Sequence, residues 1–160
     1  MKRLDQLLAA NENYVRGRHA DDSAHPRRKL AIVTCMDARI DVFAALGLQL
    51  GEALILRNAG GRVTEDVLRS LALATHVLGI DAIVLMQHTG CGLEGRSDAE
   101  LQQLTGADLG FLPITDHKQA LQDDIKVLEG IDYLSHIELL AGLQYDVLTG
   151  EVQDVTRIER

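Results

Sequence analysis

Two cysteines and a histidine stand in polar segments where their side chains can bind a metal. His88 and Cys91 are three residues apart, a spacing that lets both side chains turn toward one ion, and Cys35 lies 53 residues before His88. Two thiolates and one imidazole suit zinc, which prefers tetrahedral nitrogen and sulfur ligation. A structural zinc site closes with four such ligands, whereas a catalytic one leaves a position open. Because the chain has no third cysteine, the sequence favours an open, catalytic site.

Five further histidines are possible fourth ligands, but none stands beside the end of a predicted strand. His76 falls within a helical pattern and is interpreted as a packed or surface histidine. The other four lie in polar stretches and are interpreted as solvated: His19, His25, His117 and His136.

The spacing of Cys35, Asp37 and Arg39 suggests a second function for this segment. If the segment stays extended, residues two apart project to the same side. Arg39 can then hold the carboxylate of Asp37 in a bidentate clamp and favour its charged form. Asp37 would either reach the fourth metal position or be held away from it. The alternative is a surface ion pair that contributes little.

Three short apolar runs have the pattern of strands buried on both faces, and each leads into a polar segment. They cover residues 30–34, 53–56 and 82–86. A helical pattern over residues 64–79, from Thr64 to Gly79, separates the second run from the third, so a parallel sheet is predicted. Ligands of such sheets bind at the carboxyl ends of the strands. We therefore expect the three polar segments to meet at one rim.

The whole chain is predicted to be one α/β domain, residues 1–160, with a mostly parallel central sheet, an antiparallel edge strand and flanking helices. The other predicted elements are a helix over 2–16 ending at Gly17, a polar connection over 18–28, a helix over 116–129 and a hairpin over 143–156 around Thr149-Gly150. The apolar stripe of the first helix is narrow, so this helix should pack on something other than its sequence neighbours.

Composition excludes several classes of protein. The 160 residues carry 16 basic and 24 acidic side chains, a net charge of −8, and only 3% are aromatic. No basic patch or stacking platform for nucleic acid is indicated, and no apolar run approaches the ~20 residues that span a bilayer. Charges near the start disfavour a signal peptide, so we expect a soluble cytoplasmic protein. In that compartment cysteines are more often metal-binding or catalytic than paired, although a Cys35–Cys91 disulfide is the alternative.

Three motifs, taken in order, resemble the signature segments of the beta-class carbonic anhydrases of the short bacterial and archaeal type. They are CMDAR (35–39), RNAGG (57–61) and HTGCG (88–92). The likeness continues through the helix after Thr64 and the final hairpin, and so covers nearly the whole chain. The resemblance implies that Cys35, His88 and Cys91 bind zinc, with Asp37 as a switchable fourth ligand and Arg39 as its clamp.

The same resemblance implies a reaction, an assembly and a substrate-binding turn. The reaction is the reversible hydration of carbon dioxide to bicarbonate and a proton through a zinc-bound hydroxide. At low pH, Asp37 would leave Arg39 and ligate zinc, giving an inactive form. The assembly is a homodimer or a dimer of dimers in which the N-terminal helix, residues 1–17, lies over the partner. Asn58, Gly60 and Gly61 would line the substrate site, and no residue stands out as a proton shuttle.

Other functions remain as alternatives. Gly90 and Gln87 differ from the charged residue and the histidine that are common at these places in the family, so hydrolysis of carbonyl sulfide or carbon disulfide on the same zinc site is the first alternative. A non-catalytic zinc module is a lower one, because a closed structural site needs neither Asp37 nor Arg39. The GCGLEG sequence (90–95) matches a dinucleotide-binding pattern, but it follows the third predicted strand rather than the first.

Overall fold

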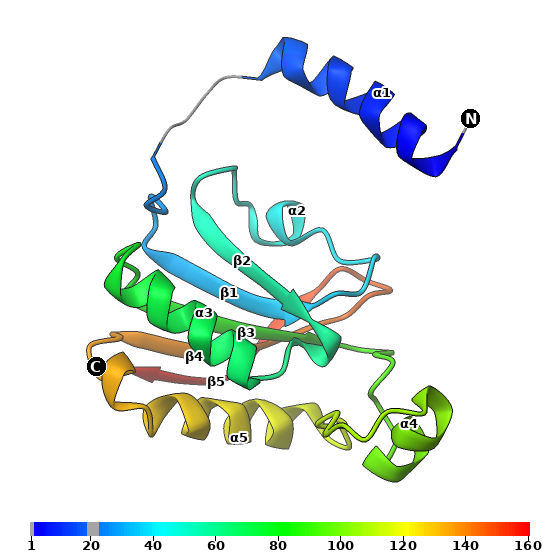
Figure 1. Ribbon diagram of the computed structural model, residues 1–160. Helices are drawn as coiled ribbons and strands as arrows, with labels where there is room; N and C mark the ends of the chain where they lie inside the picture. The colour runs from blue at the N-terminus through cyan, green and yellow to red at the C-terminus, as the bar shows by residue number, and fades with distance from the viewer. Residues whose placement is uncertain (1, 19–22) are drawn as a thin grey trace.

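Five strands form one sheet in the order β2-β1-β3-β4-β5 (Figure 1). The computed structural model describes residues 2–18 and 23–160. The strands are β1 (Leu30–Cys35), β2 (Ala53–Asn58), β3 (Ala82–His88), β4 (Leu139–Tyr145) and β5 (Val152–Glu159). The first four are parallel to their neighbours and β5 is antiparallel to β4, which confirms the predicted α/β class and the antiparallel edge strand.

The helices begin and end at residues whose side chains or backbone suit those positions. They are α1 (Arg3–Gly17), α2 (Val42–Leu46), α3 (Glu65–His76), α4 (Asp98–Thr105) and α5 (His117–Glu129), with single 3-10 turns η1 (Ala59–Gly61) and η2 (Asp132–Leu134). Thr64 and Asp116 each accept a backbone N–H at the start of α3 and α5, as N-cap residues do. The predicted helix over 64–79 ends earlier, at His76. Helices α2 and α4 were missed because five and eight residues are too few to show a clear periodicity.

Strands β1 and β3 have continuous apolar runs because both faces of the sheet are covered there. Ala31 and Val33 of β1 face the side on which α3 and α5 pack, and Ile32 between them faces the opposite cluster. Neighbouring residues of a strand point to opposite faces, so a strand covered on both sides needs apolar residues at every position. The opposite cluster contains residues of α2, α4 and the loops beside them.

The strand order places the three polar segments at one rim. β1 lies between β2 and β3, with Cys35 paired to Asn58 at the end of β1 and β2, and Thr34 paired to Met86. All three strands run in the same direction, so their carboxyl ends are neighbours. This arrangement confirms the predicted parallel unit and brings the CMDAR, RNAGG and HTGCG segments together.

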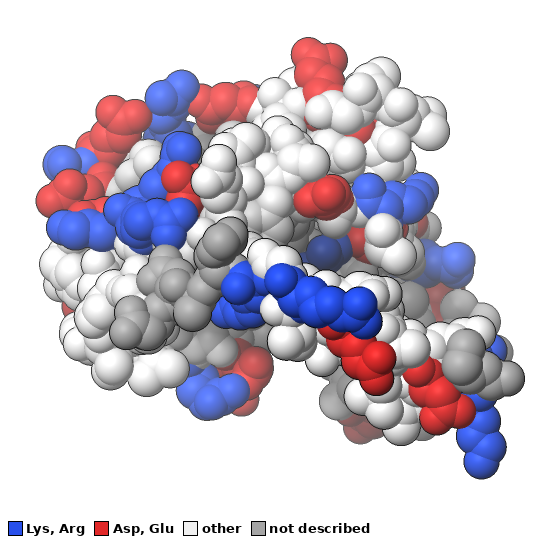
Figure 2. All heavy atoms as spheres, turned by 90° about the horizontal axis from the view of Figure 1, so that it is seen from above, with Lys and Arg blue, Asp and Glu red and all other residues white. Residues whose placement is uncertain are grey.

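Helix α1 lies away from the sheet and buries none of its residues (Figure 1). Its apolar side chains are all exposed, including Leu4, Leu7, Leu8, Tyr14 and Val15. On the face that Figure 2 shows, acidic and basic side chains are intermixed. In the described part of the chain, no helix combines the length and apolar character needed to cross a bilayer. His19 and part of the predicted connection over 18–28 lie outside the described residues.

Candidate metal centre

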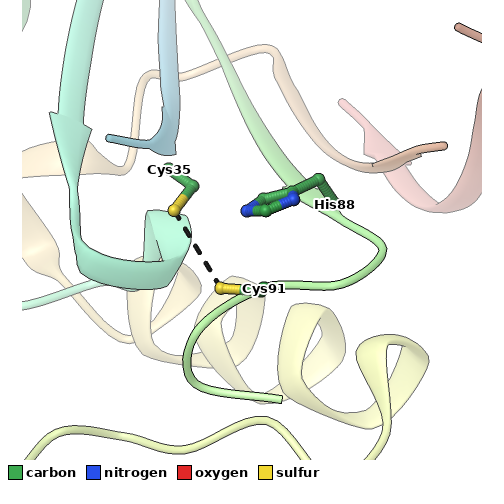
Figure 3. A group of neighbouring side chains, drawn as sticks. All are labelled: Cys35, His88 and Cys91. Atoms are coloured by element: carbon green, nitrogen blue, oxygen red, sulfur yellow. Dashed lines mark hydrogen bonds between the residues drawn. The ribbon is translucent and has the colours of Figure 1, made fainter. Parts of the chain in front are cut away.

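Cys35, His88 and Cys91 converge at the rim of the sheet, and Figure 3 shows both sulfur atoms and the imidazole ring turned toward one another. Their ligand atoms all lie within 4.8 Å of one another, and this is the one such group found in residues 2–18 and 23–160. Cys35 ends β1, His88 ends β3, and Cys91 follows in the next turn. All three are buried, with at most 7% of each residue exposed.

The spacing of the two sulfur atoms fits a metal and not a disulfide. The Sγ atoms are 4.0 Å apart, and both cysteines are free. Two zinc–sulfur bonds of ~2.3 Å at a tetrahedral angle would separate the sulfurs by about 3.8 Å, whereas a disulfide bond measures about 2.05 Å. The disulfide considered from the sequence is therefore not formed.

The imidazole of His88 presents a free nitrogen to the two sulfurs. Its Nδ1 lies 2.9 Å from the carbonyl oxygen of Thr89. Because a carbonyl can only accept a hydrogen bond, Nδ1 carries the hydrogen and Nε2 keeps its lone pair. Nε2 is buried and has no hydrogen-bond partner, which is costly for a polar atom unless it binds something. A metal ligand with its second ring nitrogen bonded to a carbonyl is the usual arrangement of histidine at metal sites.

The two thiols differ in acidity in the metal-free protein. The hydrogen bond from Cys91 lowers the pKa of Cys35 to about 4, and the same interaction raises the pKa of Cys91. Burial alone would lower the pKa of His88, but the neighbouring Cys35 thiolate and Asp37 carboxylate raise it overall. One thiolate is thus present before any metal binds, and a cation would have to displace the proton of Cys91.

Asp37 and Arg39 form a clamped pair beside the cluster. The guanidinium of Arg39 donates to both carboxylate oxygens of Asp37, Nε to Oδ1 at 2.9 Å and Nη2 to Oδ2 at 2.7 Å. The Arg39 hydrogen bonds hold the pKa of Asp37 well below its usual range, so the carboxylate stays charged. Its Oδ2 lies 3.8 Å from Nε2 of His88. The carboxylate is therefore next to the ligand group but held by Arg39.

The segment is not extended as the sequence analysis assumed. β1 ends at Cys35 and the chain turns, because the backbone N–H of Arg39 also donates to Asp37 Oδ1 at 2.9 Å. The clamp arises from this local turn and not from the alternation of an extended strand. The pairing of Asp37 with Arg39 is nevertheless as predicted.

Comparisons with known proteins agree with these observations. A family model described as carbonic anhydrase matches residues 30–124. Beta-carbonic anhydrase 1 of Mycobacterium tuberculosis is 35% identical over 158 residues, which cover 95% of this chain and 97% of that protein. The chain belongs to the beta-carbonic anhydrase family. It is therefore placed in an enzyme family, consistent with carbonate dehydratase, a lyase.

Two further proteins show the range of the likeness. The crystal structure of a carbonic anhydrase from Streptococcus mutans has a TM-score of 0.89 and 41% identity, with 98% of this chain and 99% of that one covered. A carbon disulfide hydrolase of Saccharolobus solfataricus is 48% identical over 66 residues, which are 41% of this chain and 32% of that protein. The second match is local, whereas the proteins of Mycobacterium tuberculosis and Streptococcus mutans match over nearly the whole chain.

Arg57, the first residue of the RNAGG motif, has a part in this beta-carbonic anhydrase that the sequence analysis missed. Its guanidinium donates to three backbone carbonyls of the CMDAR segment and the residue after it, those of Cys35, Asp37 and Ile40. It therefore holds the turn that carries Asp37. An arginine that ends the apolar run of β2 was the signal that could have found it, because a guanidinium has five N–H donors that can reach the carbonyls of a neighbouring turn.

The RNAGG turn packs against the end of β1. The N–H of Gly60 donates to Cys35 Sγ at 3.3 Å. Gly61 has φ +62°, and a Cβ there would lie 2.9 Å from the backbone of Thr34, so only glycine fits. The side chain of Asn58 bonds the N–H and carbonyl of Arg62 and so closes the turn. The substrate-binding role of Asn58, Gly60 and Gly61 stays a prediction.

The other histidines in the described part of the chain fall outside the ligand group. His25, His76 and His136 are exposed, as expected of solvated or surface residues. His117 is different, because it is 8% exposed and its ring lies between Gln87 and Glu94. The interpretation of His117 as solvated is therefore wrong. The residue stands in a polar stretch of sequence, but it faces inward as the first residue of α5.

Proposed function

We propose that this chain catalyses the reversible hydration of carbon dioxide to bicarbonate and a proton, with zinc held by Cys35, His88 and Cys91. The observation that carries the proposal is the buried, unpartnered Nε2 of His88 facing two sulfur atoms 4.0 Å apart. Zinc, when bound, supplies a hydroxide nucleophile at neutral pH by lowering the pKa of water toward ~7. Two thiolates and one imidazole are ligands that zinc prefers, and three protein ligands leave the fourth position of a tetrahedral site open.

Asp37 and Arg39 act on the reacting water in this proposal. The charged carboxylate of Asp37 accepts a hydrogen bond from the water and so directs its lone pair toward carbon dioxide. Arg39 keeps Asp37 charged and away from the ligand position, through two side-chain hydrogen bonds of 2.9 and 2.7 Å. At low pH we expect Asp37 to leave Arg39 and ligate zinc, which would inactivate the enzyme.

A cavity of about 510 Å³ lies beside Arg39. Its lining combines apolar side chains, among them Ile40, Val42, Phe43 and Ile55, with the guanidinium groups of Arg39 and Arg57 and the carboxylate of Asp41. None of the three ligand residues lines this cavity, so we propose it as an approach for carbon dioxide and not as the place of the reaction. Apolar walls accept carbon dioxide without loss of hydrogen bonds.

The decisive experiment is stopped-flow carbon dioxide hydration on protein whose zinc content has been measured. We expect about one zinc per chain and a rate well above the uncatalysed one. Asp37→Ala and Arg39→Ala should each lose activity by at least roughly tenfold while zinc is retained. The exposed pair Asp66 and Arg69 on α3, joined by two hydrogen bonds to one carboxylate oxygen, supplies the controls Asp66→Ala and Arg69→Ala, which should leave the rate unchanged. A chain that binds no zinc would refute the proposal.

Hydrolysis of carbon disulfide or carbonyl sulfide is the second candidate. It is favoured by the local 48% identity to the carbon disulfide hydrolase of Saccharolobus solfataricus. A zinc-loaded protein that leaves carbon dioxide unchanged but releases sulfide from either compound would support this candidate over the first.

We also propose that the single domain of residues 1–160 works as a homodimer or a dimer of dimers, with α1 lying over the partner. The exposed apolar row of α1, with no buried residue in the helix, supports this. Leu7→Glu should then lower the molar mass measured by light scattering, whereas Leu148→Glu, at a leucine that is 91% exposed, should not. A monomeric wild-type chain would contradict the proposal. The free thiols further favour the reducing cytoplasm.

A further inference from the structure

The turn that carries Cys91 is held from two sides. The carboxylate oxygen Oε2 of Glu94 accepts hydrogen bonds from the N–H of Gly90 at 2.7 Å and of Cys91 at 3.3 Å. On the other side, Nη2 of Arg39 donates to the carbonyl of Gly90 at 3.0 Å. Gly90 has φ +65°, so successive N–H groups converge as they do in anion-binding turns. Here the anion is the carboxylate of Glu94, three residues after Cys91.

The second oxygen of Glu94 faces a buried histidine. Nε2 of His117 lies 3.6 Å from Oε1 of Glu94, and Nδ1 lies 3.0 Å from Oε1 of Gln87. Gln87 is fully buried and directly precedes His88 in β3. Glu94, His117 and Gln87 therefore lie in a row between the residue before one ligand and the turn that carries another, although Nε2 of His117 has no hydrogen-bond partner. His117 is fixed in place as the first residue of α5.

We infer that Glu94 is a positioning residue for the metal: its carboxylate holds the Gly90–Cys91 turn in the shape that directs Cys91 Sγ at the ion. His117, anchored on Gln87, packs beside this carboxylate and limits the positions that it can take. The inference rests on the metal site of the proposed function. The three ligands of such a site must be preset to gain full affinity, and side chains that orient ligands contribute roughly 10–100-fold to metal affinity.

Charge and hydrogen bonding at Glu94 can be separated by substitution. Glu94→Gln keeps an oxygen that accepts from both N–H groups but removes the charge. Glu94→Asp keeps the charge but is one methylene too short to reach the turn, and Glu94→Ala removes both. A positioning role predicts that zinc affinity follows the hydrogen bonds, so Glu94→Gln should remain within roughly threefold of wild type. Glu94→Asp and Glu94→Ala should bind zinc roughly 10–100-fold more weakly.

Zinc dissociation constants are measured by competition with a chromophoric chelator, beside the free energy of unfolding of each metal-free protein. Glu100→Ala is the matched control, because the carboxylate of Glu100 also accepts a backbone N–H, that of Ser97 at 2.7 Å, but on α4. Glu100→Ala should lower the free energy of unfolding without changing the zinc dissociation constant. In cobalt-substituted Glu94→Ala, the thiolate-to-cobalt absorption band should shift from that of the wild type.

His117 is tested through its coupling to Glu94. If His117 acts through the carboxylate, His117→Ala should weaken zinc binding in the wild type and have little further effect in Glu94→Ala. If Glu94→Ala does not fold, the zinc affinities of Glu94→Gln and Glu94→Asp test the inference, and Glu94→Gln should bind zinc more tightly. Equal weakening in these two variants, or unchanged affinity in both, would overturn the positioning role. Absence of zinc binding by the wild type would instead refute the proposed metal site.

Discussion

Breaking the ion pair between Arg62 and Asp124 by removing one partner should cost more stability than breaking any other charged pair described in residues 2–18 and 23–160. Their side chains are 8% and 5% exposed, and two hydrogen bonds join them, Nε to Oδ2 at 2.7 Å and Nη2 to Oδ1 at 3.1 Å. The N–H of Val63 also donates to Asp124 at 3.3 Å. The pair connects the residue after the RNAGG turn to the middle of α5.

Asp124→Ala leaves the guanidinium of Arg62 buried, with only the carbonyls of Leu112 and Pro113 as partners. Removing one partner of a buried pair costs about 3–5 kcal/mol, because the remaining charge is uncompensated. For a chain of this size each kcal/mol lowers Tm by about 2–4 °C, so we expect a fall of roughly 6–20 °C. Adding Arg62→Met should recover part of this loss, since it removes the unpaired charge.

Denaturant unfolding at a fixed protein concentration measures the effect, because dissociation of an oligomer would otherwise contribute. The matched control is Asp123→Ala, one residue away on the same helix, where the carboxylate is 53% exposed and 4.0 Å from Lys126. An exposed pair of this kind contributes at most about 1 kcal/mol. Equal losses in Asp123→Ala and Asp124→Ala would show that burial of the pair does not decide its contribution.

Two further outcomes are expected at the rim of the sheet. Zinc binding near pH 8.5 should release about two protons per chain, one from Cys91 and one from the water that zinc binds, because the pKa of Cys35 is already lowered to about 4 and zinc lowers the pKa of its water toward ~7. Zinc affinity should fall with falling pH as His88, whose pKa is raised, becomes protonated. An indicator-dye titration counts the released protons, and about three protons at pH 8.5 would contradict the unequal acidity of the thiols. Gly61→Ala should destabilise by more than Gly150→Ala in denaturant unfolding, since both have positive φ but a Cβ meets the backbone of β1 only at Gly61; equal losses would count against the close approach.

The position of the metal site could be predicted because it depends on topology. Continuously apolar strands indicated a parallel sheet, and a parallel sheet brings strand ends to one rim. Cys35 and His88 are 53 residues apart in sequence, yet both stand at such ends. The details of the turn after Cys35 could not be predicted, because they depend on which carbonyls and carboxylate the side chains of Arg39 and Arg57 reach.

Helix α5 carried a signal that the sequence analysis did not use. Its buried residues are His117, Ala120, Leu121, Asp124, Ile125 and Leu128, which repeat every three or four positions. Two of these six are polar and stand where the pattern requires apolar side chains. A polar group on the buried face of a helix is costly unless it has a partner. The pattern alone therefore predicts that His117 and Asp124 each have a polar partner on the elements against which α5 packs.

Both residues reach segments next to the metal site. His117 contacts Glu94, which holds the turn of Cys91, and Asp124 holds Arg62, whose backbone closes the turn of Gly60 and Gly61. The apolar residues of α5 fix the helix on the sheet. Its two polar residues then contact residues that follow two of the three motif segments. These contacts depend on where the helix lies. A substitution that shifts α5 on the sheet, such as Leu121→Ala, should therefore weaken zinc binding although Leu121 is not one of the ligands. The same exchange at Leu71 of α3, which is as fully buried on the same face, should cost similar stability and leave zinc affinity closer to that of the wild type.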